Sequence, residues 1–246
     1  MLAKSRSVTV APFHCALAVA ALCANIICTG TAAAANVTVN AVTSGFYVST
    51  GSAFSGGYFV GNSLLLSPPG EYRAYVSFSL AGISDPVTAA TLRLSMPNGG
   101  YISPDATEGV GAFDVSTNLA LLTSGSGGVG AFADLGTGLQ LGSTTVSSSS
   151  NGTNIDFTLN LNGINYINAG LGNSIAVGLA GTTLSFSSSA TEVFFNNSGA
   201  AGLNRQLLLV TSPIPEPATA LVMAVGLALM LGRVGVNSRA QRRRPE

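Results

Sequence analysis

The residues in this chain that could support chemistry are almost all carboxylates. Asp105, Glu108 and Asp114 lie within ten residues of one another and form its densest acidic group. Carboxylate oxygens are the hard ligands that Ca²⁺ prefers, although this spacing does not match the EF-hand loop. Two carboxylates are also the groups that hydrolysis of a glycosidic bond requires. Solvated loop acids without a ligand remain the simpler interpretation, and we assign no metal site.

Nucleophilic hydrolysis and zinc chemistry lack their usual side chains over most of the chain. The only histidine, His14, and the cysteines, Cys15, Cys23 and Cys28, all precede residue 30. A nucleophilic serine or cysteine normally needs a histidine or lysine base, and zinc sites are usually built from histidine and cysteine. The sequence therefore predicts a protein that is not an enzyme, with a carboxylate-dependent glycosidase or lyase kept as the least favoured alternative.

A glycine-rich run, GSGGVG at residues 125–130, matches the glycine spacing of a dinucleotide-binding loop. That loop needs a buried strand before it and a helix after it, and the following AFADLGTG is a poor helix former. We expect residues 124–130, and the VSSSS run at 146–150, to form flexible loops, and we assign no cofactor.

Alternating apolar residues predict the strands that must position these side chains. Turn-forming clusters such as SPPG and PNGG separate the runs, and residues 116–123 and 161–171 have short helical patterns. This alternation favours an all-β, single antiparallel β-sandwich, jelly-roll-like, with short helices. The residues expected on buried faces are Tyr72, Ala74, Val76, Phe78, Leu80, Leu92, Leu94, Met96, Ile155, Phe157, Leu159 and Leu161.

The charge of the middle region argues against a nucleic-acid partner. Between residues 36 and 212 three arginines stand against eight carboxylates, which is a net charge of −5. Phosphate contacts need a basic surface. Arg73 and Arg93 fall on predicted strands, where a salt bridge, for Arg73 to Glu71, is a simpler role than ligand binding. The six tyrosines are expected in the core or at its rim rather than as a platform for sugars.

The stretch YRAYVSFSLAGISDPVTAATLRLSMP, at residues 72–97, resembles the opening of two kinds of bacterial β-sandwich. It is similar to modules of the DNRLRE type and to jelly-roll carbohydrate-binding modules. The resemblance implies the same sandwich fold, and a carbohydrate-binding protein without catalysis as an alternative function.

The first 35 residues have the three parts of a secretory signal peptide. A basic start precedes an apolar stretch, and Ala33 and Ala35 provide the small residues that signal peptidase requires, so we expect cleavage before Asn36. The sequence thus predicts export across the inner membrane.

The last residues, 213–246, combine a proline-framed glutamate, an apolar run and a basic tail. Pro215, Glu216 and Pro217 precede an apolar run of 15 residues, from Ala218 to Gly232, which is short for a spanning helix of about 20. Under the positive-inside rule the basic cluster stays in the cytoplasm and leaves the middle domain outside. These basic residues are Arg233, Arg239, Arg242, Arg243 and Arg244.

The motif, the apolar run and the basic tail together resemble the PEP-CTERM sorting signal of Gram-negative bacteria. The resemblance implies an exosortase, a membrane processing enzyme, as partner, and an association with exopolysaccharide and biofilm matrix. The predicted organisation is a signal peptide (1–35), a β-sandwich domain (36–212) and a sorting signal with a transmembrane helix (213–246). The predicted role is a structural protein, anchored in the membrane before processing and then located at the cell surface or outside the cell.

Overall fold

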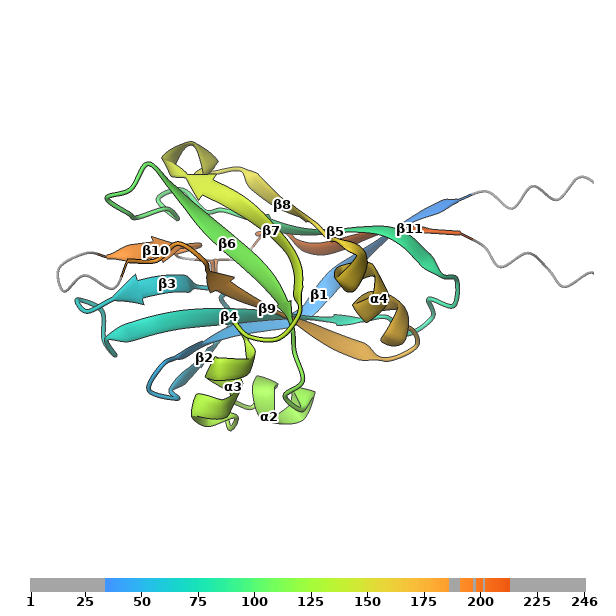
Figure 1. Cartoon of the computed structure of the whole chain (residues 1–246), viewed down its shortest axis with the longest axis horizontal. Helices are drawn as coiled ribbons and strands as arrows, with labels where there is room; N and C mark the ends of the chain where they lie inside the picture. The colour runs from blue at the N-terminus through green and yellow to red at the C-terminus, as the bar shows by residue number, and fades with distance from the viewer. Residues whose placement is uncertain (1–33, 186–190, 197, 201, 213–246) are drawn as a thin grey trace, which may run out of the picture. The chain divides into compact units, whose positions relative to one another are not determined.

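Antiparallel β-strands make up most of the described chain, and its helices are few and short (Figure 1). The structure, a computed structural model, describes residues 34–185, 191–196, 198–200 and 202–212. The prediction of an all-β fold is confirmed at this level. The signal peptide up to residue 33 and the sorting signal from residue 213 lie outside the described residues.

Eight strands follow one hydrogen-bonded path, in the order β7-β6-β9-β4-β1-β11-β5-β8, and β2, β3 and β10 pair beside it. The strands are β1 (Ala35–Val48), β2 (Ala53–Ser55), β3 (Val60–Ser63), β4 (Gly70–Ser79), β5 (Val87–Ser95), β6 (Thr107–Asp114), β7 (Gln140–Ser147), β8 (Asn154–Thr158), β9 (Ser174–Gly181), β10 (Glu192–Phe194) and β11 (Arg205–Thr211). The helices are α2 (Leu119–Thr123), α3 (Gly128–Asp134), the 3₁₀ helix η1 (Ser148–Ser150) and α4 (Leu161–Ala169).

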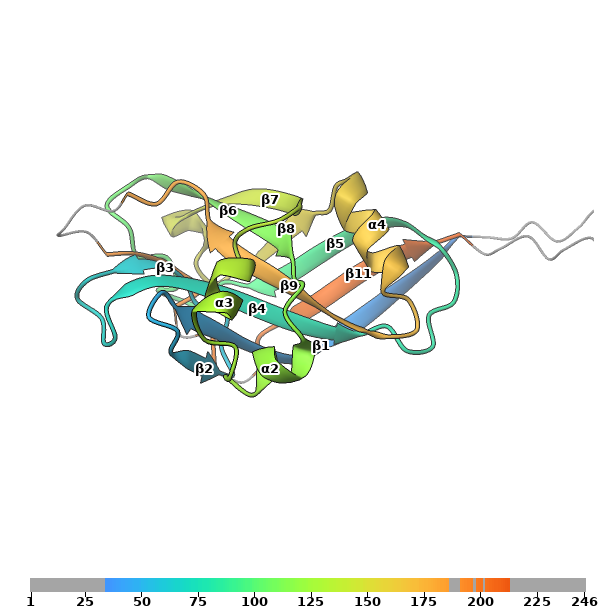
Figure 2. The same ribbon diagram turned by 60° about the horizontal axis from the view of Figure 1, so that its bottom comes forward.

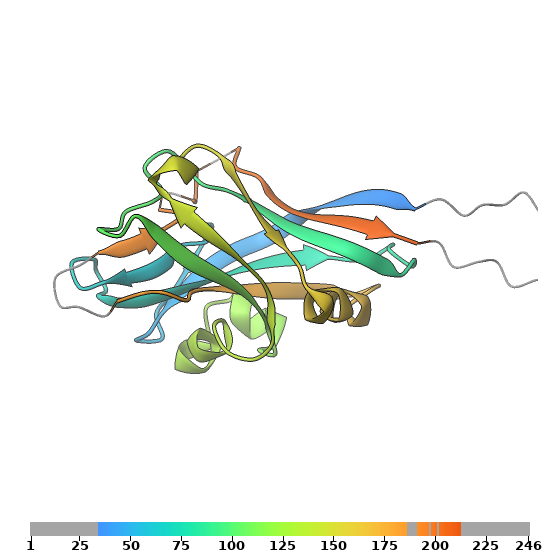
Figure 3. The same ribbon diagram turned by 45° about the horizontal axis from the view of Figure 1, so that its top comes forward.

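The two ends of this path meet, so the sheet nearly closes into a barrel (Figure 3). An isolated bridge joins Gly142 of β7 to Leu159, just after β8, and the amide of Asn160 donates to the Leu141 carbonyl at 2.7 Å. Helix α4 follows at this point and sends Ile167 into the core. Closure protects backbone groups that open sheet edges would leave unpaired.

Strand β1 takes part in both halves of the sheet (Figure 2). Its first residues, from Ala35 to Asn40, pair with β11, and its later residues pair with β4. The register shifts between Ala41 and Thr43, which leaves Val42 as an exposed bulge residue. A bulge bends its strand and increases the local twist, and here it allows one strand to cross from one half to the other.

The predicted alternation describes the core well, with one error. All the residues expected on buried faces are buried except Leu161, which is exposed. Leu161 breaks the pattern because the strand ends at Thr158 and α4 begins at Leu161, where the period changes from two to 3.6. The core joins side chains from β4, β5, β8, β9 and β11 in one cluster.

Helices α2 and α3 cover one face of β1 and β4, and the sequence predicts α2 but not α3. Tyr47 of β1 and Tyr75 of β4 pack in one cluster with Leu122 of α2 and Phe132 of α3. The expectation of a flexible loop is wrong from Gly128 onward, because burial of Ala131 and Phe132 stabilises a helix that propensity alone disfavours. The VSSSS run likewise forms the end of β7 and η1.

The described domain contains its own core, and its first and last strands are neighbours. Ala35 pairs with Thr211, so the chain enters and leaves the domain at one end. Every strand that the structure describes finds its partner among residues 35–211, as is expected of a domain that can fold on its own. Within the described residues, no helix has the length and apolar character that crossing a bilayer requires.

Gly61 in β3 generates a prediction about the close approach of β3 and β10. Its φ is +144°, and a Cβ there would lie 2.1 Å from the Glu192 carbonyl oxygen. We expect Gly61→Ala to lower the free energy of unfolding by about 2–4 kcal/mol. Gly82→Ala, at φ +85° with no atom within 4 Å of the added Cβ, should cost only about 1 kcal/mol. Equal losses in urea denaturation of residues 36–212 would contradict this account.

Asp134 generates a prediction about pH. Its carboxylate accepts hydrogen bonds from the amides of Ser116 and Thr117, at 3.0 and 2.7 Å, and from the Ser116 hydroxyl at 2.6 Å. Partial burial raises its pKa, but these hydrogen bonds together outweigh burial and hold the pKa below its ordinary value of 3.8. A lowered pKa stabilises the fold above the unfolded-state value, and this stability is lost as the pH falls through the folded-state value.

We therefore expect Asp134→Asn to lower the free energy of unfolding at pH 7 by about 1 kcal/mol or less, since solvent screens this half-buried group. The difference from the unsubstituted domain should shrink between pH 5 and pH 2.5, as measured by urea denaturation across that range. A difference that stays constant over this range would show that the charge of Asp134 has no part in it.

Candidate functional site

The acidic group in the structure differs in one member from the group that the sequence predicts. Oxygens of Asp105, Glu108 and Glu192 lie within 4.8 Å of one another. Asp114 is not among them, because it lies at the other end of β6, where it accepts a hydrogen bond from the Leu139 amide at 2.7 Å. Glu192 joins the group because β10 reaches it through the Ile102–Val193 bridge. No local sequence signal connects Glu192 with residues some 85 positions earlier.

Hydroxyl groups satisfy the two buried members of this acidic cluster, which comprises Asp105, Glu108 and Glu192. Glu108 accepts hydrogen bonds from the Ser103 hydroxyl, at 2.7 Å, and from the Thr183 hydroxyl. Glu192 accepts from the amide of Ser185 at 2.7 Å and from the hydroxyl of the same residue. Burial, joined by the neighbouring carboxylates, raises the pKa of Tyr101, whose hydroxyl donates to the Asp105 carbonyl at 2.6 Å.

The acidic cluster offers three hard oxygen ligands, whereas Ca²⁺ takes six to eight. Asp105 is exposed, but Glu108 and Glu192 have relative exposures of 1% and 0%. A polysaccharide therefore has no direct access to the two buried carboxylates, as a glycosidase pair would require. The arrangement can hold negative charge close to a small cation, and it does not form an open catalytic groove.

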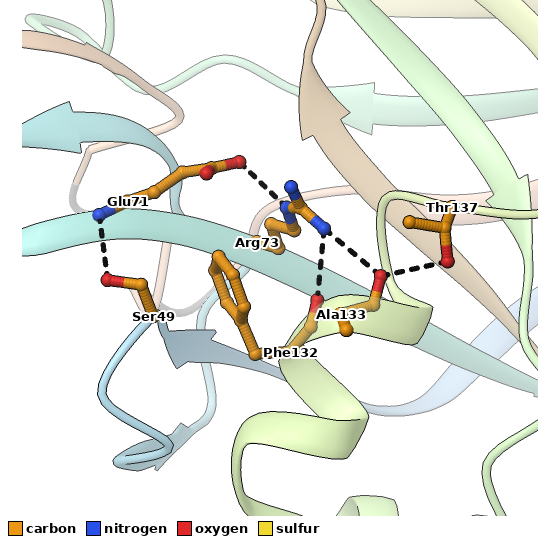
Figure 4. Close-up of polar contacts among 6 residues, drawn as sticks. All are labelled: Ser49, Glu71, Arg73, Phe132, Ala133 and Thr137. Atoms are coloured by element: carbon orange, nitrogen blue, oxygen red, sulfur yellow. Dashed lines mark hydrogen bonds and ion pairs between the residues drawn. The ribbon is translucent and has the colours of Figure 1, made fainter. Parts of the chain in front are cut away.

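The arginines of the described residues are engaged within the fold. Arg73 donates to Glu71 at 2.7 Å, as predicted, and to the carbonyls of Phe132 and Ala133 at the end of α3 (Figure 4). Its guanidinium also lies 4.4 Å from the centre of the Phe132 ring. Arginine near a helix C-terminus complements its free carbonyls. Arg73 thus fastens α3 to β4.

The other two arginines have comparable structural roles. Arg93 and Asp156 are paired residues of β5 and β8 and form two hydrogen bonds of 2.7 Å. Arg205 donates to the Ser44 hydroxyl at 2.7 Å and lies over the Tyr58 ring. The described residues thus present no basic surface for phosphate groups.

The tyrosines lie in or at the core, as predicted. Five are buried, and Tyr166 is partly buried, with its hydroxyl donating to the Ala176 carbonyl at 2.7 Å. Burial raises the pKa of Tyr58 to about 12, opposed by the nearby Arg205. These residues do not form an exposed row of rings on which a sugar chain could stack.

An aromatic hollow, which the sequence did not reveal, lies where β1, β2 and the β3–β4 loop meet. It has a volume of about 400 Å³ and is lined by twelve residues, none of them charged. Phe46 stacks on Phe54, with ring centres 4.9 Å apart, and Phe59 contacts Tyr72 edge to face at 4.8 Å. Because Phe46, Phe59 and Tyr72 come from three separate strands or loops, only the fold brings them together.

The residues of the predicted signal cleavage site and sorting signal are placed only in part. Ala35 and Asn36 are the first two residues of β1 and pair with Thr211 and Val210. Ala33, the motif Pro215-Glu216-Pro217 and the C-terminal arginines lie outside the described residues.

Comparison with known proteins adds no relative. No protein-family model matches the chain, and no curated protein matches it.

The acidic cluster generates a prediction about stability. In Glu192→Gln the amide can still accept from the Ser185 amide and can donate to its hydroxyl, while one of two neighbouring buried charges is removed. We therefore expect the free energy of unfolding to rise by about 1 kcal/mol in EDTA. Glu71→Gln, which breaks an ion pair, should lower it by up to about 1 kcal/mol.

Urea denaturation of residues 36–212 measures both changes. The reverse order, with Glu192→Gln less stable than Glu71→Gln, would contradict the account. The same measurement with 1 mM Ca²⁺ adds a test, because a bound cation would stabilise the unsubstituted domain and leave Glu192→Gln unchanged.

Proposed function

We propose that this chain is an exported structural protein of the cell surface or extracellular matrix, sorted by an exosortase and without catalytic activity. The observation that carries the proposal is the order of features in residues 213–246. Pro215-Glu216-Pro217, an apolar run and a cluster of arginines follow one another after a chain that begins with a signal-peptide pattern. The apolar run would hold the chain in the membrane, and the arginines would set the orientation of that run.

The boundaries of the domain support this organisation. The last paired residue, Thr211, lies four positions before Pro215, and the first strand begins at Ala35. Cleavage before Asn36 would remove only the first residue of β1 with its pairing to Thr211, and processing after Thr211 would leave the remaining pairs and the core complete. The proposed partners are an exosortase-type enzyme, the inner membrane and the exopolysaccharide of the matrix, and the proposal includes no nucleic acid.

The proposal also includes the finer description of the fold as a jelly-roll-like β-sandwich. It is supported by the two halves of the sheet, which share β1 and enclose one core. A non-catalytic carbohydrate-binding protein is the second candidate, favoured by the aromatic hollow and disfavoured by the burial of the tyrosines. A glycosidase or lyase is third, because the buried carboxylates are closed to a polymer.

Glu216 provides the test of sorting. In a host with an exosortase, we expect Glu216→Ala, or deletion from Pro215 onward, to change the mature mass of the protein or its retention in the membrane. Cell fractionation and intact-protein mass spectrometry measure these outcomes.

Glu246→Ala is the matched control, since it removes a glutamate of the same tail outside the motif. It should be processed like the unsubstituted chain. The proposal fails if Glu216→Ala leaves both mass and location unchanged.

A further inference from the structure

Three consecutive leucines lie exposed in the loop between β3 and β4. Leu64, Leu65 and Leu66 have relative exposures of 52%, 78% and 39%, and Phe54 beside them has 41%. A run of exposed apolar residues costs solubility and marks an interaction surface when it is retained. Among the residues that the structure describes, nothing covers this run.

The leucines border the aromatic hollow, so one face carries both an apolar projection and an apolar cavity. Leu66 lines the hollow together with Phe46, Phe54 and Phe59, and Leu64 and Leu65 precede it directly. We call this face, with Leu64, Leu65, Leu66 and Phe54 around the hollow, the tip. It lies at the end of β1 opposite to Ala35, about 35 Å away at the rise of an extended strand.

We propose that the tip binds the tip of a second copy of this chain. A projection and a cavity on the same face are self-complementary, so two copies related by a two-fold axis can each place Leu65 in the hollow of the other. Such a contact is closed and stops at two molecules. It accounts for the leucines and the hollow together, whereas a saccharide in the hollow leaves Leu65 exposed.

The distribution of charge supports a second copy as the occupant. Each domain has a net charge of −5, so two copies avoid direct contacts between like charges where they meet through an uncharged surface. No residue that lines the hollow is charged, and neither are the leucines. An anionic membrane is a poorer partner, because the tip offers no basic side chain to its headgroups.

The size of the tip sets the strength of the contact. Four exposed side chains and a hollow provide less than the roughly 800 Å² per partner that stable complexes bury, so the pair is weak in solution. Copies held in an array would gain from effective concentration. The array rests on the proposed function, which places many copies at the cell surface. Pairing of two copies in solution does not depend on sorting.

Sedimentation velocity of residues 36–212, from about 10 µM to about 1 mM, tests the inference without detergent, which would cover the leucines. We expect the mean mass to rise toward twice that of the monomer. Leu65→Asp should weaken association at least tenfold. Leu161→Asp is the matched control, because Leu161 is 70% exposed at the start of α4, and it should associate like the unsubstituted domain.

Amide chemical shifts provide a second measurement. Concentration should shift the signals of Phe54 and Gly57 and leave those of α4 unchanged. The inference is overturned by a monomer at every concentration, or by association that Leu65→Asp leaves intact. Binding of cellohexaose or of phosphatidylglycerol vesicles to a domain that stays monomeric would also overturn it and would identify a different occupant.

Discussion

The pairing of β1 with both β11 and β4 is the constraint on which the rest of this fold depends. The first half of β1 bonds to β11 and its second half to β4, with the bulge at Val42 between them. Through β11 the strand reaches β5 and β8, and through β4 it reaches β9, β6 and β7. One core can therefore form only when both halves of β1 are in register, because a shift by one residue would reverse every side chain.

The sequence predicted the strands and their buried faces, since alternation is a local property that burial preserves. It failed where distant segments decide the outcome. Helix α3 forms because Ala131 and Phe132 pack in the cluster that contains Tyr75, and propensity alone had indicated a loop. Glu192 lies close to Glu108 because the bridge between Ile102 and Val193 brings β10 to this place, and no residue near Glu192 in the sequence predicts that bridge. The aromatic hollow is likewise assembled from segments whose meeting depends on the closed sheet.

The polar groups of the domain serve mainly to hold the fold together. Arg73, Arg93 and Arg205 are each bound to a partner, and Asp134 fastens the segment before α2 to the end of α3. The tip is the part of the described surface that combines a hollow with exposed apolar side chains and has no charged residue. This agrees with the proposed structural role, in which the proposed sorting signal sets the location and the proposed contact at the tip joins copies.

The place of β11 between β1 and β5 has a mechanical consequence. Strand β11 is the last described element before the predicted anchor, so a pull on its C-terminal end that is opposed at the tip is directed along its axis. Both of its antiparallel ladders, six pairs to β1 and seven to β5, then bear the load in shear. Under that load their hydrogen bonds must break together rather than one after another, so the domain should resist force applied between its C-terminal end and the tip.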